Sequence, residues 1–329
     1  MKLGMEIPAF PTVSPMRLLA PGGRKLKRWF PFAEKNGQLT FLGRTAIYHG
    51  LQTLDLARGS TVLVPAYHEG VEIDTLLASG YHLRYFRVSK NLGVDLADVT
   101  KRLDSSMSAL YVIHYFGFPQ PIDDIRAFCD RHGLKMIEDC ALALFSRDRA
   151  TWLGSVGDMA IFSVHKTLPV ANLGFLLTRT ATPLHHLRPV PVTTTFVQTV
   201  DVLRRSVRAT PMAPVERAAM AMRRLLTRTT SLDVVQDVNP EEGQWASRMA
   251  EIGVSRWSRY MLHGTDPEKI ISRRRRNYRH LATRLNDRLQ LPFPSLPDGV
   301  CPLFLPLLVE NKLEVQRRLA ERGVMCVSF

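Results

Sequence analysis

Two apolar runs in the middle of the chain each end on residues that can do chemistry. The run 134–137 is followed by Glu138 and Asp139, and the run 159–164 is followed closely by Lys166. Buried strands of open α/β sheets carry their functional side chains at the carboxyl ends, where such sheets bind ligands. A lysine that forms a Schiff base, with an aspartate that keeps a pyridine nitrogen protonated, is the core of a pyridoxal phosphate (PLP) site. The spacing therefore favours Lys166 and Asp139 as a candidate pair.

Both residues also have plainer interpretations. A carboxylate at a strand end commonly caps a helix, and a lysine at a strand end is most often a solvated surface residue. The pair points to PLP chemistry only if the two strands lie in one sheet and end at the same edge.

The residues from Thr40 onward have the pattern needed to build such a sheet. Strands of alternating or continuous apolar residues follow helices that stop at glycines, which implies right-handed crossovers and a largely parallel sheet. We expect an α/β fold with helices on both faces. The predicted elements are a helix ending at Gly59, strands at 60–67, 81–89, 109–117 and 135–140, and helices at 69–80 and 121–133.

A glycine turn, Gly43-Arg44-Thr45-Ala46, opens the first of these helices. Free backbone N–H groups and the positive end of a helix make such a turn a seat for phosphate. Taken alone, a turn of this type is more often only a helix cap. The turn is therefore a second candidate feature, which the other motifs must support.

Seven short motifs occur in an order that resembles the DegT/DnrJ/StrS sugar aminotransferase family of fold-type I PLP enzymes. No single motif is specific, and the likeness lies in their order over residues 40–329. The motifs are GRTAI (43–47), VPAYHEGVEID (64–74), VIHYFG (112–117), IEDCA (137–141), GSVGD (154–158), FSVHKTLP (162–169) and RRRRNY (273–278).

The resemblance implies a three-layer αβα large domain that binds PLP, with a small α+β C-terminal domain. It implies that Lys166 is catalytic and holds the cofactor, that Asp139 pairs with the pyridine nitrogen, and that Glu138 is a spectator. The residues it implies for the phosphate are Gly43, Thr45, Ala46 and Ser163. The implied reaction moves an amino group from a glutamate-like amino-acid donor to a nucleotide-linked keto sugar, in a homodimer.

The chain departs from the family pattern at several positions. Glu69 stands near the place of the aromatic residue that usually stacks on the cofactor ring, where Tyr67 or His68 could substitute. Asn172 stands in a segment, NLG, that replaces the usual pair of glycines. The asparagine that typically reaches across to the neighbouring subunit has no counterpart at 249–256. Two alternative functions follow, a PLP-dependent sugar dehydratase and a degenerate relative with a binding or regulatory role.

Three regions are expected. Residues 1–38 are a basic, proline-rich arm on the surface or on a partner subunit. Residues 39–245 form the PLP-binding domain, in which 181–239 is a connection with amphipathic helices. Residues 246–329 form the small domain, which we expect to be incomplete because relatives continue for several tens of residues; its predicted elements are a long helix at 267–289, a strand at 301–309 and a helix at 313–323.

Charge and composition limit the classes of partner that the protein is expected to bind. The 329 residues include 44 basic and 30 acidic ones, giving a net charge of +14, and RRRR at 273–276 is the best support for nucleic-acid binding. A solvated basic helix face explains it more simply, so we expect neither nucleic acid nor a membrane as partner. The four cysteines have no metal-ligand spacing, which predicts reduced thiols in a cytoplasmic protein without a required metal.

Overall fold

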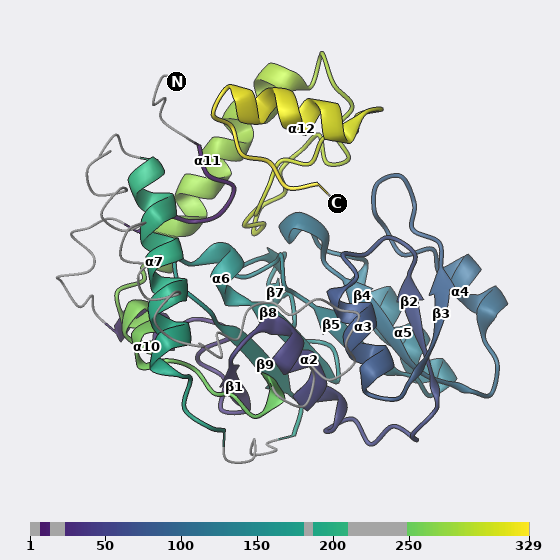
Figure 1. The fold of residues 1–329 in the computed structure, drawn as a ribbon. Coiled ribbons are helices and arrows are strands. Elements are labelled where there is room, and N and C mark those ends of the chain that lie inside the picture. Colours follow the sequence, from purple (N-terminus) through teal and green to yellow (C-terminus); the bar gives the residue numbers. More distant parts are fainter. Residues whose placement is uncertain (1–6, 14–23, 181–186, 210–248, 329) are drawn as a thin grey trace.

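A seven-stranded sheet lies at the centre of the computed structural model, which describes residues 7–13, 24–180, 187–209 and 249–328 (Figure 1). The strand order is β1-β9-β8-β5-β4-β2-β3. The five strands from β8 to β3 run parallel, whereas β9 is antiparallel to β8 and to β1. The strands are β1 (Gly37–Thr40), β2 (Thr61–Pro65), β3 (His82–Phe86), β4 (Met107–Ile113), β5 (Lys135–Asp139), β8 (Met159–Ser163) and β9 (Gly174–Thr178).

Helices cover both faces of the sheet because successive strand residues point to opposite sides. Val62 and Tyr111 pack on the side of α2 and α3, whereas Leu63 and Leu110 pack on the side of α4 and α5. The predicted α/β class with a mostly parallel sheet is confirmed. The helices of these layers are α2 (Gly43–Leu51), α3 (Val71–Ala78), α4 (Leu96–Arg102) and α5 (Ile122–His132).

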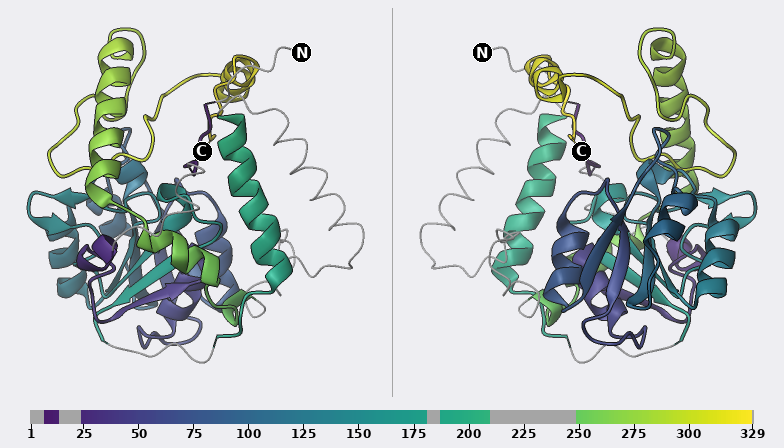
Figure 2. Two further views of the ribbon diagram at one scale, coloured as in Figure 1. Left: turned by 90° about the vertical axis from the view of Figure 1, so that its left-hand side faces the viewer. Right: turned by 90° about the vertical axis from the view of Figure 1, so that its right-hand side faces the viewer.

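The remaining helices frame one end of the sheet (Figure 2). The long helix α7 stands along its side, and α12 lies near the end of α7. Of the amphipathic helices predicted within 181–239, α7 accounts for the first part, while residues 210–248 lie outside the described ranges. Within the described ranges no helix has the length and apolarity to cross a membrane. The helices are α7 (Val192–Arg208), α10 (Arg256–His263), α11 (Pro267–Leu285) and α12 (Lys312–Glu321).

Several predicted elements differ from the structure. The first helix ends at Leu51 and not at Gly59, and the antiparallel strands β1 and β9 were not predicted. The predicted strand at 301–309 is wrong. Its backbone pairs with no strand, and Leu303 N–H donates instead to the carbonyl of Phe116. An apolar run becomes a strand only where a neighbouring strand completes its hydrogen bonds.

The described part of the N-terminal segment contributes to the core. A short 3-10 helix, η1 (Arg24–Arg28), leads into Phe30, which is buried and stacks on Trp152 at a ring separation of 5.7 Å. Farther toward the N-terminus, Ile7 forms a β-bridge with Val324. The N–H of Ile7 donates to the carbonyl of Gly323, and the N–H of Met325 donates to the carbonyl of Ile7. These contacts connect the beginning of the chain to the sheet and to the segment after α12.

The basic run 273–276 is not a uniformly solvated face. On α11, Arg274 donates to the carbonyls of Leu303 and Thr167, and Arg275 donates to the carbonyls of Pro297 and Val300. Burial lowers the pKa of the Arg274 guanidinium, and its bonds satisfy carbonyls that would otherwise lack donors. Two of the four arginines therefore join α11 to neighbouring segments.

Candidate active site

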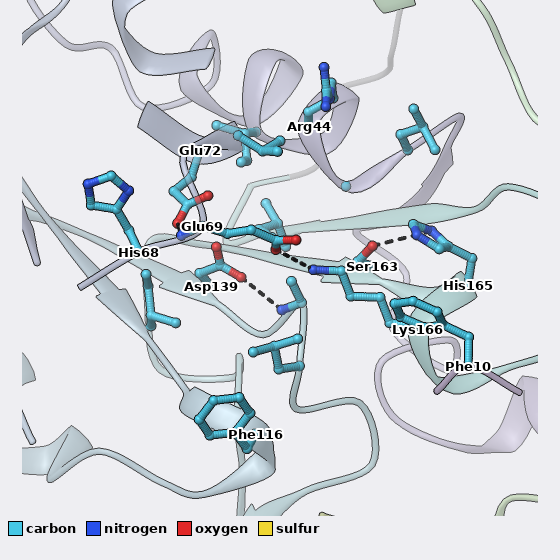
Figure 3. A pocket seen from close by; sticks show the side chains of 18 of the residues that line it. Phe10, Arg44, His68, Glu69, Glu72, Phe116, Asp139, Ser163, His165 and Lys166 are labelled. Atoms are coloured by element: carbon cyan, nitrogen blue, oxygen red, sulfur yellow. Dashed lines mark hydrogen bonds and ion pairs between the residues drawn. The ribbon is translucent and has the colours of Figure 1, made fainter. Parts of the chain in front are cut away.

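A pocket of about 680 Å³ opens at the carboxyl edge of the parallel strands (Figure 3). Its lining comes from the segments after β2, β4, β5 and β8, from the start of α2, and from α7. Of the six predicted site residues, four line it: Gly43, Asp139, Ser163 and Lys166. The topology therefore brings together residues that are up to 123 positions apart, the separation of 43 and 166.

Lys166 lies on α6 (Val164–Thr167), a one-turn helix directly after β8. Its side chain is 14% exposed, and its Nζ lies 2.6 Å from Oε2 of Glu69. The short apolar strand β8 is fully buried, so the turn that follows it directs the lysine into the pocket (Figure 3). The lysine is therefore not a solvated surface residue.

Asp139 ends β5 with its carboxylate in the pocket. Its Oδ2 accepts a 2.7 Å hydrogen bond from the hydroxyl of Tyr111, and its Oδ1 accepts a 2.8 Å bond from the N–H of Ala141. Burial, and then the negative charge of Glu72, raise the pKa of Asp139 to about 6, against the opposing effect of these bonds and of Lys166. A cation placed beside this carboxylate would stabilise its ionised form.

Glu138 is the adjacent residue but lies outside the pocket lining. Its carboxylate is fully buried and accepts bonds from the backbone N–H groups of Gly154, Val156 and Gly157 and from Nε2 of His114 at 3.0 Å. Burial raises its pKa, but the bonds from His114 and the backbone lower it by more, so the net shift is downward. Glu138 thus fixes the loop between β5 and β8.

His114, Glu138 and Cys140 place possible metal-binding atoms within 4.8 Å of one another, and all three are buried. An ion there would have to displace the backbone N–H groups that already occupy both oxygens of Glu138. The cluster is explained by the hydrogen bonds that it makes.

The start of α2 meets the end of β8 at one side of the pocket. A Cβ added to Gly43 would lie 3.3 Å from Cβ of Ser163, so a side chain at this position would crowd Ser163. Leu42 at the N-cap makes no side-chain hydrogen bond to the helix, which leaves the first N–H groups of α2 without a cap. Thr45 and Ala46 lie behind the lining, fully buried.

The hydroxyl of Thr45 is buried and has no hydrogen-bond partner among the described residues. An unpaired buried hydroxyl costs free energy unless a ligand completes it. Together with the uncapped helix start, it fits an anion such as a phosphate group. The lysine, the aspartate and this anion seat are the three features that a PLP site needs.

Comparisons with known proteins agree with this geometry. Residues 40–182 match the model of the DegT/DnrJ/EryC1/StrS aminotransferase family. This region, which is less than half of the chain, is similar to that family. The fold is shared with the aminotransferase TlmJ from Streptoalloteichus hindustanus, with a TM-score of 0.64 and 18% identity over 98% of this chain and 85% of the other.

Two curated relatives of the aminotransferase-family region are named as sugar-modifying enzymes. GDP-perosamine synthase of Vibrio cholerae is 27% identical over 138 residues, which cover 41% of this chain and 38% of the relative. The dTDP-4-dehydro-2,3,6-trideoxy-D-glucose 4-aminotransferase of Saccharopolyspora spinosa is 32% identical over 129 residues, or 38% and 34%. The chain thus spans little more than a third of the length of the relatives it matches.

The sequence did not point to several residues of the pocket. Tyr111, which lies outside the pocket lining but donates to Asp139, is one residue of an apolar strand among many. Glu72, which is in the lining, lies on a helix that the sequence predicted only by its pattern. The face of α7 brings Asp201 and Arg205 into the lining, outside the aminotransferase-family region. Their spacing of four residues on an amphipathic helix was the one available signal in the sequence.

The departures from the family pattern also have defined surroundings. Tyr67, His68 and Glu69 all line the pocket, and Tyr67 contacts the ring of Tyr115. Asn172 is fully buried, donates to the side chain of Gln198 on α7 and accepts a 3.1 Å bond from Ser258 on α10. The residue that replaces a glycine therefore links the segment after Lys166 to two helices.

Proposed function

We propose that the chain is a PLP-dependent aminotransferase that transfers an amino group from an amino-acid donor, such as glutamate, to a nucleotide-linked keto sugar. The observation that carries the proposal is that Lys166 and Asp139 line one pocket, beside an uncapped helix start with an unpaired hydroxyl. The substrates in the names of the two relatives support the substrate class.

We assign the following roles to the residues of the site. Gly43, Thr45 and Ser163 would hold the phosphate group, and Asp139 would face the ring nitrogen. When bound, PLP supplies an electron sink for breaking bonds at the carbon that carries the amino group. Lys166 would hold the cofactor and, once free, accept a proton on Nζ and return it.

Asp139 contributes through charge. Because its pKa of about 6 lies near neutrality, the carboxylate is ready to ionise fully when a protonated nitrogen is placed beside it. Tyr111 and Ala141 hold both oxygens in fixed directions, so the acid cannot turn toward solvent. His165, whose pKa is lowered to about 4 by burial and by the charges of Lys166 and Arg205, is neutral at pH 7.

We further propose a cytoplasmic homodimer, in keeping with the expected site at a subunit interface. Light scattering of the purified protein tests the oligomeric state.

The test of the function begins with cofactor attachment. Protein incubated with PLP and reduced with borohydride should carry the phosphopyridoxyl mass on the peptide that contains Lys166, and Lys166→Ala should carry none. Incubation with glutamate should then convert the unreduced cofactor to its amine form. No label on Lys166 would contradict the cofactor role. Labelled protein that gives no amine form with any amino acid would contradict the aminotransferase assignment.

A further inference from the structure

Lys166, the pocket residue that we expect to react, forms an ion pair with Glu69 in the loop after β2. The separation of Nζ and Oε2 is 2.6 Å, and the glutamate side chain is 43% exposed against 14% for the lysine. Glu69 is therefore the more exposed member of the pair, and its carboxylate points toward the lysine (Figure 3).

The backbone of Glu69 is held in place independently of this ion pair. Its N–H donates a 2.9 Å hydrogen bond to Oε1 of Glu72, in the first turn of α3. The next residue, Gly70, has φ of 106°, a conformation that favours glycine, and forms the N-cap of α3. The loop thus presents the glutamate in a fixed position.

Glu69 is the acid that contacts the amine. The other charged or titratable groups of the lining come from every element around the lysine, but among the described residues none of the other acids lies within ion-pair distance, 4.0 Å, of Nζ. These groups are Arg44 on α2, Tyr67 and His68 after β2, Glu72 on α3, Tyr115 after β4, Asp139 at the end of β5, His165 on α6, and Asp201 and Arg205 on α7.

We propose that Glu69 is a positioning residue that holds the Nζ of Lys166 in an ion pair, directed into the pocket, until the lysine reacts. The ion pair must break before the reaction, because only the free amine is a nucleophile. We call this ion pair the latch, because it restrains the lysine in the protein without PLP. Its consequence for cofactor loading rests on the proposed function, but the latch itself does not.

The reaction that the latch restrains is the condensation of the lysine with an aldehyde. The ammonium loses one proton to water, and the amine nitrogen then bonds to an aldehyde carbon. The aldehyde oxygen leaves as water with the two remaining hydrogens of the nitrogen, which gives a carbon–nitrogen double bond. Breaking the ion pair with Glu69 precedes the first of these steps.

Competitive acetylation of the protein without PLP tests the latch. Trace isotopic acetic anhydride is added at pH 7.5, and the acetylation of Lys166 is measured by mass spectrometry against that of the exposed Lys90. Glu69→Gln should raise the relative rate at Lys166 about fivefold, the scale of one partly exposed ion pair. Glu69→Asp, which keeps the charge, should lie between the parent and Glu69→Gln.

Asp201→Asn is the matched control, since it removes a carboxylate of the same pocket that makes no ion pair with Nζ. It should change the rate less than twofold. An unchanged or lower rate in Glu69→Gln, or an equal rise in Asp201→Asn, would overturn the proposal. Circular dichroism confirms that each variant is folded, and Glu69→Ala serves as a second variant.

A separate measurement distinguishes the latch from the proposed function. PLP is added to the parent and to Glu69→Gln, and attachment is followed by absorbance and by borohydride reduction. If the latch and the proposed function are both correct, PLP should attach to Lys166 faster in Glu69→Gln than in the parent. If the acetylation result holds but neither protein attaches PLP, the latch stands and the proposed function fails.

Discussion

The hydroxyl of Tyr111 donates a hydrogen bond to the carboxylate of Asp139 over 2.7 Å. The two residues lie on the neighbouring parallel strands β4 and β5, where Tyr111 is paired in register with Ile137, two positions before Asp139. Tyr111 is fully buried, and burial raises its pKa further above its ordinary range, so it remains a donor at all ordinary pH values. The bond fixes the direction of the acid at the bottom of the pocket.

Asp139 should reduce the stability of the protein without cofactor at neutral pH. Its pKa of about 6 in the folded state exceeds the ordinary 3.8, so the folded state binds the proton more tightly than the unfolded chain. Its contribution is therefore complete at low pH and is lost as the pH rises from about 4 to about 6, by roughly 3 kcal/mol. Asp139→Asn should be more stable than the parent at pH 8 and equally stable at pH 4, measured by urea unfolding. If the free energy of unfolding of the parent increased relative to that of Asp139→Asn as the pH rose, the prediction would be wrong.

Glu138→Gln should have the opposite effect on folding. The amide would place an N–H₂ group against backbone donors that now bond to the carboxylate, and it would remove the charge that pairs with His114. Removing one member of such a buried network costs about 3–5 kcal/mol. The matched comparison is Asp139→Asn, the same acid-to-amide change at the next residue. Equal unfolding midpoints for the two variants would show that the Glu138 network is dispensable.

Thr45→Val should separate cofactor binding from stability. Because the hydroxyl has no partner among the described residues, its replacement by a methyl group should leave the stability of the unloaded protein unchanged or higher. If the hydroxyl bonds a phosphate, the affinity for PLP should fall about tenfold, as expected for about 1.5 kcal/mol from a bond to a charged group. Equilibrium dialysis gives the affinity.

Thr40→Val is the control for that experiment. The hydroxyl of Thr40 is also buried but donates a 2.9 Å bond to the carbonyl of Leu42. This variant should lose stability by about 1 kcal/mol. If Thr45→Val were destabilised as much as Thr40→Val, the hydroxyl of Thr45 would have a partner within the protein.

Arg274→Met should destabilise the attachment of α11. The guanidinium donates to the carbonyls of Pro302, Leu303 and Thr167, so its loss leaves three acceptors without this donor and should cost about 2 kcal/mol or more. Arg276→Met is the control, because Arg276 is exposed on the same helix. Limited proteolysis after α11 should accelerate in Arg274→Met alone. Equal protection of both variants would contradict the structural role of Arg274.

The sequence by itself determined the class of the fold and the edge of the sheet at which the candidate residues gather. Apolar runs of strand length, separated by helices that end at glycines, require a parallel sheet, and parallel strands end at one edge. Asp139 and Lys166 each follow such a run, so their meeting could be predicted from local pattern alone. The unpredicted strands β1 and β9 lie at the side of the sheet where the connections are antiparallel, which local pattern does not reveal.

The tertiary structure decided which side chain meets which partner. Glu138 and Asp139 are neighbours of the same charge, yet the strand directs one into a buried network of backbone donors and the other into the pocket. Glu69 reaches Lys166 across 97 positions of the chain, and Arg274 is half-buried and hydrogen-bonded within a run that the sequence predicted to be solvated. Local residue patterns encode the period of a helix or strand, but the partner of a polar group depends on distances between segments, which exist only after the chain has packed.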